Sequence, residues 1–274
     1  MSLYARARLR RGVARTAALA AGGSRGGTLR ILTYHRVNAD HPHDRLSVHP
    51  DVFAEELEEV ARSGRRVVPL EEGLAGLEAG RPAPVDESVA LTFDDGYEDN
   101  VSVALPILER FGFRATFFLA TVLIGTGKVI DRYRGCCAED TMMDWGQARD
   151  LRARGHTIGA HGRRHLELDT LAPSDLRDEV EGSARDVERE VGARPGLFCY
   201  PRGSVNARVR RAVAESGFEG ACTVRPGANE PGRDPLVLRR TEISAGDRAD
   251  DVRLKLSGGF DAWHHLVQLR WRPW

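Results

Sequence analysis

Hydrophobic residues recur along the chain at two spacings, and each spacing predicts one kind of secondary structure. Short apolar or β-branched runs predict strands, whereas apolar residues at i, i+4, i+7 and i+8 predict amphipathic helices. The clearest helix covers residues 174–191, where one apolar stripe runs between charged faces: Leu176, Val180, Ala184, Val187 and Val191. The predicted strands are residues 29–34, 66–70, 88–93, 115–120, 156–160, 197–200, 220–224 and 236–243. The predicted helices are residues 50–62, 71–79, 101–111, 144–154, 174–191 and 206–216.

Strands and helices alternate in this prediction, as about seven or eight βα units with no internal repeat. Such alternation is typical of a parallel sheet, and right-handed crossovers leave two arrangements, a closed barrel or an open doubly wound sheet. A chain of 274 residues is long enough for one large α/β domain. Of the two arrangements we favour the barrel.

Charge and cysteine content exclude some classes of protein. Lys+Arg and Asp+Glu are both 40, so no overall field indicates a nucleic-acid partner. The four cysteines, Cys136, Cys137, Cys199 and Cys222, form neither a zinc-knuckle spacing nor a disulfide framework. No apolar run is long enough to span a bilayer. We therefore expect a cytoplasmic protein with free thiols.

The first 28 residues form a basic leader. Its arginines resemble the start of a signal peptide, but the apolar stretch that follows, residues 16–21, is too short and too rich in alanine to complete one. Two interpretations fit the leader: a basic helix that contacts an anionic membrane surface peripherally, or a disordered segment. In both cases we expect it to be retained.

The first polar cluster with chemical potential follows the predicted strand 88–93. Asp94 and Asp95 are adjacent carboxylates after an apolar strand, and buried charge needs a cation or many hydrogen bonds. Gly96 permits a sharp turn, so that one carboxylate can bind a metal while the other acts as a base. The alternative is that the pair only caps the next helix.

The second cluster follows the predicted strand 156–160. His161 and His165 have the i, i+4 spacing that brings two imidazoles to one side of a helical turn, where they can hold one metal ion. The carboxyl ends of parallel strands form one rim of a barrel. Asp95 and the two histidines therefore predict a three-ligand hydrolytic metal site with open positions.

The third cluster, FCYPRG at residues 198–203, follows the predicted strand 197–200. Pro201 fixes its own φ and Gly203 permits an unusual one, so the loop can aim backbone amides inward, where they would stabilise an oxyanion. From these residues alone, an ordinary Pro-Gly turn is the favoured interpretation.

In order and spacing, TFDDG, HGRRH and FCYPRG resemble the motifs of the NodB-homology polysaccharide deacetylases, carbohydrate esterase family four, in the branch with a Phe-x-Tyr-Pro-x-Gly third motif. The resemblance covers about residues 29–258. It does not include the leader, residues 1–28, or residues 259–274, which we expect to form a C-terminal helix and tail. It implies a distorted (β/α) barrel of about seven strands.

For chemistry, the resemblance implies that a water activated by Zn²⁺ or another divalent metal attacks the N-acetyl group of a polysaccharide, oligosaccharide or glycoconjugate. Asp95, His161 and His165 would be the metal ligands and Asp94 the general base. The backbone amide of Arg202 would share the negative charge of the tetrahedral oxygen with the metal.

The chain departs from the family pattern at three points. The residue after the first histidine ligand is usually Ser or Thr, whose hydroxyl braces the loop, and here it is Gly162. The arginine that pairs with the base in many relatives is replaced by Cys199, and we expect Arg240 to supply this cation from the last strand. The usual acid histidine has no counterpart, and His35 is the candidate for protonating the leaving amine, with a packing role as the alternative.

Two other functions were weighed against a glycan deacetylase. A metal-dependent amidase acting on a small non-sugar amide would use the same metal site with a different pocket. A catalytically silent carbohydrate-binding protein would need neither both aspartates nor both histidines, yet all four are present.

Overall fold

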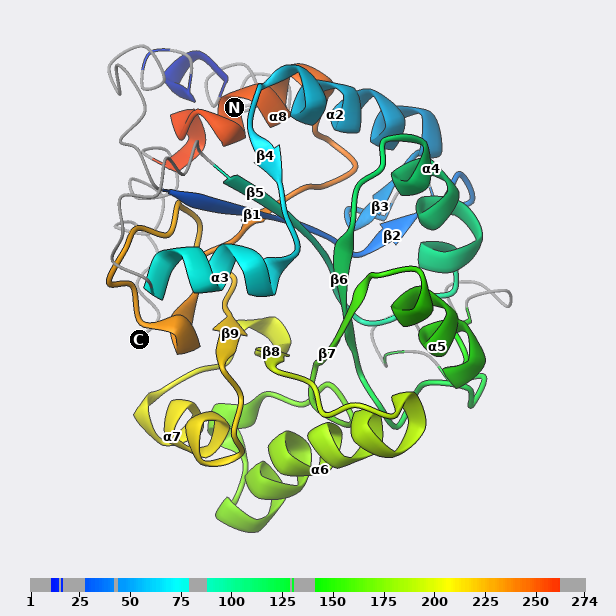
Figure 1. The fold of residues 1–274 in the computed structure, drawn as a ribbon, viewed down its shortest axis with the longest axis vertical. Coiled ribbons are helices and arrows are strands. Elements are labelled where there is room, and N and C mark those ends of the chain that lie inside the picture. The colour runs from blue at the N-terminus through cyan, green and yellow to red at the C-terminus, as the bar shows by residue number, and fades with distance from the viewer. Residues whose placement is uncertain are drawn as a thin grey trace.

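The computed structural model describes residues 11–14, 16, 28–41, 44–78, 88–128, 130 and 141–261. Its centre is a curled sheet of parallel strands (Figure 1), in the order β10 (Thr241–Glu242), β1 (Leu29–Tyr34), β5 (Ser88–Phe93), β6 (Ala115–Leu119), β7 (Thr157–Ala160), β8 (Leu197–Cys199) and β9 (Gly220–Cys222), with β4 (Arg66–Val67) also paired to β5. A separate parallel pair consists of β2 (Arg36–Val37) and β3 (Ser47–Val48). The sheet forms a half-barrel, which confirms the predicted fold class.

Helices surround this sheet on the outside (Figure 1): α2 (Pro50–Arg62), α3 (Leu70–Glu78), α4 (Leu105–Arg110), α5 (Trp145–Ala153), α6 (Pro173–Val191), α7 (Ala207–Glu215) and α8 (Ala249–Leu256). The apolar stripe predicted on α6 is buried at every position. The helix ends at Gly192, whose left-handed φ of 78° is adopted more easily by glycine than by residues that have a side chain. Local sequence signals therefore set both the buried face and the end of this helix.

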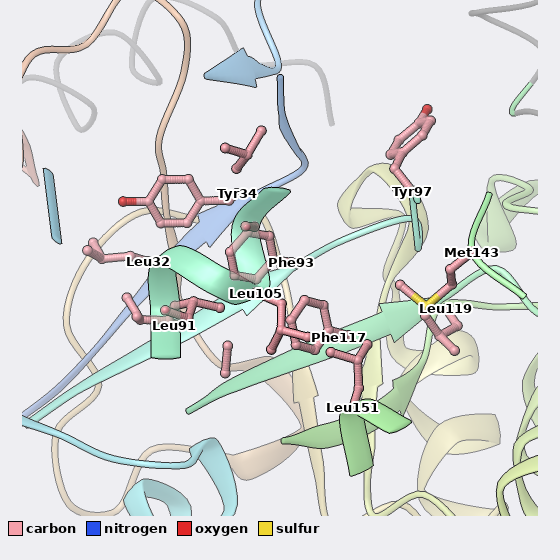
Figure 2. Packing of buried hydrophobic residues seen from close by; sticks show 14 of the residues in the cluster. Leu32, Tyr34, Leu91, Phe93, Tyr97, Leu105, Phe117, Leu119, Met143 and Leu151 are labelled. Atoms are coloured by element: carbon pink, nitrogen blue, oxygen red, sulfur yellow. The ribbon is translucent and has the colours of Figure 1, made fainter. Parts of the chain in front are cut away.

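The strands separate an apolar layer from a polar interior. Phe93 stacks on Tyr34 and Phe117, with ring centroids 5.4 and 5.0 Å away (Figure 2), and these rings lie in the core between strands and helices. Each such buried side chain stabilises the fold by roughly 1.5–3 kcal/mol. Because strand residues alternate in direction, Thr92 and Asp94 lie on the opposite face, where both accept hydrogen bonds from Arg240.

The predicted strand 236–243 is wrong over most of its length. Residues Pro235–Val237 form a 3₁₀ turn, and only Thr241–Glu242 pair with β1. Leu238 instead forms a bridge with Cys222 of β9. This segment crosses from β9 to β1 within a few residues, and a chain that changes partners so quickly cannot form one continuous strand.

The predicted helix 101–111 is confirmed only in part, because it begins as a π-helical turn at Asn100–Ala104 before α4. In this turn the Leu105 N–H donates to the carbonyl of Asn100, five residues earlier. Pro106 has no N–H to donate to the carbonyl of Ser102, so the regular i→i−4 pattern is interrupted here.

Part of the leader packs against the domain. Residues 11–14 are helical, Ala14 is buried, and Arg11 forms an ion pair of 2.7 Å with Asp251 of α8. The other leader residues, except 16 and 28, lie outside the described part, as do Cys136, Cys137 and the tail beyond residue 261. Within the described residues, no helix combines the length and the apolar character that a membrane span requires.

Candidate metal and catalytic site

The structure brings the predicted site residues to the carboxyl ends of the strands: His35 follows β1, Asp94 and Asp95 follow β5, His161 and His165 follow β7, and Arg202 follows β8. Arg240 is different, because it lies just before β10. It reaches the site from the segment that connects β9 to β10.

Asp95, His161 and His165 converge on one point. The Oδ1 atom of Asp95 lies 3.4 Å from the Nε2 atom of each histidine. The two imidazole rings are 4.9 Å apart, at an interplanar angle of 68°. One ligand atom from each of the three residues lies within 4.8 Å of the others, so a single ion could contact all three.

The expectation of a helical turn between the two histidines is wrong. His161 and His165 are joined by an irregular loop in which Gly162 and His165 adopt left-handed φ values of 69° and 58°. Asp95 and Arg202 have φ values of 78° and 54°, so every non-glycine residue with positive φ in the described chain lies at this site. Such strain persists only where the surroundings enforce it, and it is typical of functional sites.

The polar atoms at the point where the three residues meet fit a metal ion. The Nδ1 atom of His161 donates to the carbonyl of Cys199 at 2.8 Å, which leaves the Nε2 lone pair facing Asp95. Within the described part of the chain, Asp95 Oδ1, which faces both histidines, is buried without a hydrogen-bond partner. The Nδ1 atom of His165 has no partner there either, but it is Nε2 of this residue that faces Asp95. One carboxylate and two imidazoles are a usual donor set for zinc.

Electrostatics at the site also favour a cation. Burial raises the pKa of Asp95, but its histidine neighbours lower it to about 2, and burial lowers the pKa of His165 to about 4. For His161, burial lowers the pKa, while Cys199 and Asp95 together raise it well above its ordinary value. A positive charge between Asp95 and His161 is therefore favoured, and either a proton or a metal ion can supply it.

Asp94 has a different partner. The guanidinium of Arg240 donates to both of its carboxylate oxygens at 2.7 Å, and both side chains are almost fully buried. Burial would raise the pKa of Asp94, but the charge and hydrogen bonds of Arg240 hold it well below its usual range. Asp94 is thus an ionised carboxylate in a fixed orientation.

Cys199 completes the surroundings of Asp94. Its Sγ atom lies 3.0 Å from Arg240 Nη2 and 3.5 Å from Asp94 Oδ2. Burial raises the pKa of this thiol, so it remains protonated at neutral pH. The small thiol leaves room for Arg240 to contact Asp94 directly.

His35 and Arg202 lie at the edges of the site. His35, Asp94 and Arg240 line the same pocket, and the Nδ1 atom of His35 is buried with no hydrogen-bond partner in the described part of the chain. The Arg202 side chain is exposed and pairs with Glu167 at 2.7 Å. Only the backbone of Arg202 therefore remains a candidate for the oxyanion contact.

Two buried charged groups near the site were missed at the sequence level. Glu179 accepts hydrogen bonds from the loop between the two histidines, and Lys255 pairs with Asp247 at 2.5 Å in the wall of the pocket. The only signal for Glu179 was its position next to the apolar stripe of α6, where most charged residues are exposed. Lys255 is one of just two lysines in the chain, which by itself indicates nothing about its position.

A sequence model of the family described as "Polysaccharide deacetylase" matches residues 81–221, which are 141 of the 274 residues. The chain belongs to this family. It is accordingly a deacetylase, a hydrolase that acts on carbon–nitrogen bonds.

Individual relatives agree with this membership. YxkH, a Bacillus subtilis (strain 168) protein provisionally described as a polysaccharide deacetylase, is 27% identical over 219 residues, which cover 80% of this chain and 72% of YxkH. The chitin deacetylase of Colletotrichum lindemuthianum is 29% identical over 154 residues, which cover 56% of this chain and 55% of the fungal protein.

Solved structures support the fold. The deacetylase PplD of Streptococcus pyogenes, in complex with acetate, superposes with a TM-score of 0.73 at 22% identity, over 84% of this chain and 99% of PplD. IcaB from Ammonifex degensii gives a TM-score of 0.71 at 22% identity, over 86% of this chain and 98% of IcaB.

Proposed function

We propose that the chain is a divalent-metal-dependent hydrolase, with zinc as the first choice, that removes N-acetyl groups from a polysaccharide, oligosaccharide or glycoconjugate. The observation that carries the proposal is the convergence of Asp95, His161 and His165, with Asp95 Oδ1 buried and unsatisfied at the point where they meet, beside the ionised carboxylate of Asp94. A carbohydrate-binding protein without catalysis would need no such arrangement.

We also assign the chain to the branch whose third motif is Phe-x-Tyr-Pro-x-Gly. Phe198, Tyr200, Pro201 and Gly203 provide that motif, and its second position is Cys199. The support for this assignment is that the cation facing Asp94 comes from Arg240 and not from the third motif.

When bound, a divalent metal supplies a Lewis acid that polarises the acetyl carbonyl and acidifies a water molecule. Asp94 accepts the proton of the attacking water, because Arg240 keeps its carboxylate ionised and oriented. The backbone N–H of Arg202 donates to the oxygen that becomes negative in the tetrahedral state. His35, from the pocket wall, donates the proton with which the amine leaves.

The pocket beside Asp94 supports an uncharged sugar as the group that is bound. It has a volume of about 360 Å³, within the usual range for a small-molecule site. Its wall contains the ion pairs Arg45–Glu242, Lys255–Asp247 and Arg240–Asp94, so each charge is matched by an opposite one. Thr33, Thr223 and Ser244 add hydroxyl groups to the wall. A polar pocket without excess charge fits sugar hydroxyls better than an ionic substrate.

Metal analysis combined with an acetate-release assay tests this proposal. Purified protein should contain about one zinc or other divalent ion per chain and should release acetate from chito-oligosaccharides. Asp95→Ala should lose both metal and activity. Asp94→Asn should keep the metal and lose roughly 10²–10⁴-fold in turnover.

The control is Asp150→Asn, which removes an exposed carboxylate paired with Arg154 and should change neither quantity. Full activity after exhaustive chelation would exclude a metal mechanism. Release of acetate from small amides but not from acetylated sugars would show an amidase instead.

A further inference from the structure

The loop between the two proposed histidine ligands lies against α6. The backbone N–H groups of Arg163 and Arg164 both donate to Oε2 of Glu179, at 2.8 and 2.9 Å. Glu179 is fully buried, and its carboxylate is hydrogen-bonded directly to the backbone that joins His161 to His165. Hydrogen bonds from backbone N–H groups to a buried carboxylate are among the stronger ones in proteins.

The other oxygen of Glu179 is also compensated. The Nε atom of Arg164 lies 2.7 Å from Oε1, an ion-pair contact whose angles do not make it a hydrogen bond. The carboxylate therefore has two backbone donors on one oxygen and a guanidinium beside the other. A buried charge compensated in this way can hold its position without a large desolvation penalty.

Gly162 leaves the room that Glu179 needs. A Cβ atom at position 162 would lie only 3.0 Å from Oε2 of Glu179, and φ at this residue is 69°. In the family pattern described above, a Ser or Thr at this position braces the loop with its hydroxyl. Here the brace comes from α6, across 16 residues of sequence.

Arg163 fixes the same loop to α6 a second time. Its guanidinium donates to Asp178 at 2.9 Å and to Asp186 at 2.9 Å. Between these carboxylates lies Gly182, where a Cβ atom would be 2.6 Å from Cδ of Arg163. The side chain thus lies across the helix at the one position on this face where no side chain blocks it.

The two arginines between the histidines are therefore structural. Without their partners on α6, Arg163 and Arg164 could bind an anionic substrate. Their guanidinium groups are matched by carboxylates of Asp178, Glu179 and Asp186, all on α6. Little positive charge remains for a ligand.

We propose that Glu179 is a positioning residue of the metal centre, whose carboxylate holds the backbone between His161 and His165 and so sets the distance between their imidazoles. The inference rests on the metal site in the proposed function. Groups of this kind next to metal ligands change metal affinity by about 10–100-fold when they are removed.

Zinc affinity of the metal-free full-length chain, measured by competition with a chromophoric chelator, tests the role. Glu179→Ala should bind zinc about 10–100-fold more weakly. Glu179→Gln keeps an oxygen that can accept both N–H groups, so its loss should be clearly smaller. The control is Glu188→Ala, which removes an exposed carboxylate from the same helix and should leave zinc affinity unchanged.

A second measurement, amide hydrogen exchange in the metal-free wild type, does not depend on whether Glu179→Ala folds. The amides of Arg163 and Arg164 should be strongly protected. Unprotected exchange at both amides, or a folded Glu179→Ala variant that binds zinc like the wild type, would overturn the inference. If the wild type binds no divalent metal at all, the proposed function fails, while the exchange result still decides whether Glu179 holds the loop.

Discussion

Asp94 and Asp95 are neighbours in the chain with separate partners. Asp95 adopts a left-handed φ of 78°, a conformation that aspartate tolerates better than most residues. The turn directs its carboxylate to His161 and His165, while that of Asp94 faces Arg240. Two identical side chains thus acquire different partners from their surroundings, as the proposed roles of ligand for Asp95 and base for Asp94 require.

Replacement of Arg240 by lysine tests how Asp94 is held. A lysine ammonium cannot donate to both carboxylate oxygens in parallel, as the guanidinium does. We expect Arg240→Lys to lower kcat for acetate release by about tenfold or more, since one correctly placed hydrogen bond to a charged group contributes roughly 1.5–3 kcal/mol. Zinc affinity should stay within about twofold of wild type, because Arg240 contacts none of the proposed ligands.

A matched control is Arg239→Lys, at the neighbouring position, whose backbone bonds Asn229 and whose side chain makes no contact with Asp94. Its kcat should be unchanged. A wild-type kcat in Arg240→Lys would show that the bidentate pair does not orient the base.

At the residue scale, sequence alone predicted the convergence of Asp95, His161 and His165, because each follows a strand of one parallel sheet. It did not predict the left-handed loop between the histidines, since the i, i+4 spacing fits a helical turn equally well. The hydrogen bonds from His161 to the carbonyl of Cys199 and from the Arg163 N–H to Glu179 join residues that are 38 and 16 positions apart. No local pattern carries such contacts.

At the scale of elements, helices α2 and α8 pack together beside a buried carboxylic acid. Glu56 of α2 is fully buried, and no described group gives it a hydrogen bond within normal geometry. Burial and the nearby charge of Asp247 raise its pKa from 4.5 to about 8, against the opposing effects of Lys255 and Tyr34. At neutral pH the folded protein therefore keeps this carboxyl protonated.

The pH dependence of stability follows from this shift. In the unfolded chain Glu56 ionises near its ordinary pKa, so its stabilising contribution is complete below about pH 4.5 and is lost as the pH rises toward 8. Glu56→Gln, which mimics the protonated acid, should raise the free energy of unfolding at pH 8 by about 2–5 kcal/mol and have little effect near pH 4.5.

Urea unfolding of wild type and variant at several pH values measures this difference. Glu55→Gln changes an exposed residue of the same helix and should alter neither the stability nor its pH dependence. If Glu56→Gln stabilised the protein equally at all pH values, the buried carboxyl would not be the group that titrates.

Helix α5 offers a test of a local signal. Asp144 accepts the N–H of Gln147, and the Gln147 side chain accepts the N–H of Asp144, both at 2.8 Å. Asp144→Ala should lower the free energy of unfolding by about 1 kcal/mol, the usual effect of losing such a cap. Asp150→Ala, which removes an exposed pair on the same helix, should cost less than about 0.5 kcal/mol. Equal losses in chemical denaturation would show that the cap is not special.

At the scale of elements, helices and strands with strong periodicity were predicted to within one or two residues, as for α2, α6 and β5. Prediction failed where tertiary structure overrides the local pattern. Residues 236–243 look like one strand, but the chain divides its hydrogen bonds between β9 and β1. That division depends on the curl of the sheet, which cannot be read from a short stretch of sequence.

In the whole molecule, the half-barrel brings together residues that lie far apart in the sequence. The proposed metal ligands come from the ends of β5 and β7, which are separated by β6, and the cation facing Asp94 comes from beyond β9. The order of elements favoured a barrel but left an open sheet as the alternative, and the family resemblance also implied a barrel. The segment between β9 and β10 places the Arg240 guanidinium against the carboxylate of Asp94.

Because the ligands meet only in the folded chain, zinc should stabilise the native state as a whole. At a free zinc concentration about 100 times the Kd, binding adds about 2.7 kcal/mol to the free energy of unfolding. For a protein of this size that corresponds to a rise in Tm of roughly 5–10 °C. Differential scanning calorimetry with and without a chelator should show this difference in the wild type and in Asp150→Asn, and no difference in Asp95→Ala. Identical Tm values for the loaded and stripped wild type would mean that Asp95, His161 and His165 hold no ion in the native fold, and that their unsatisfied atoms need another explanation.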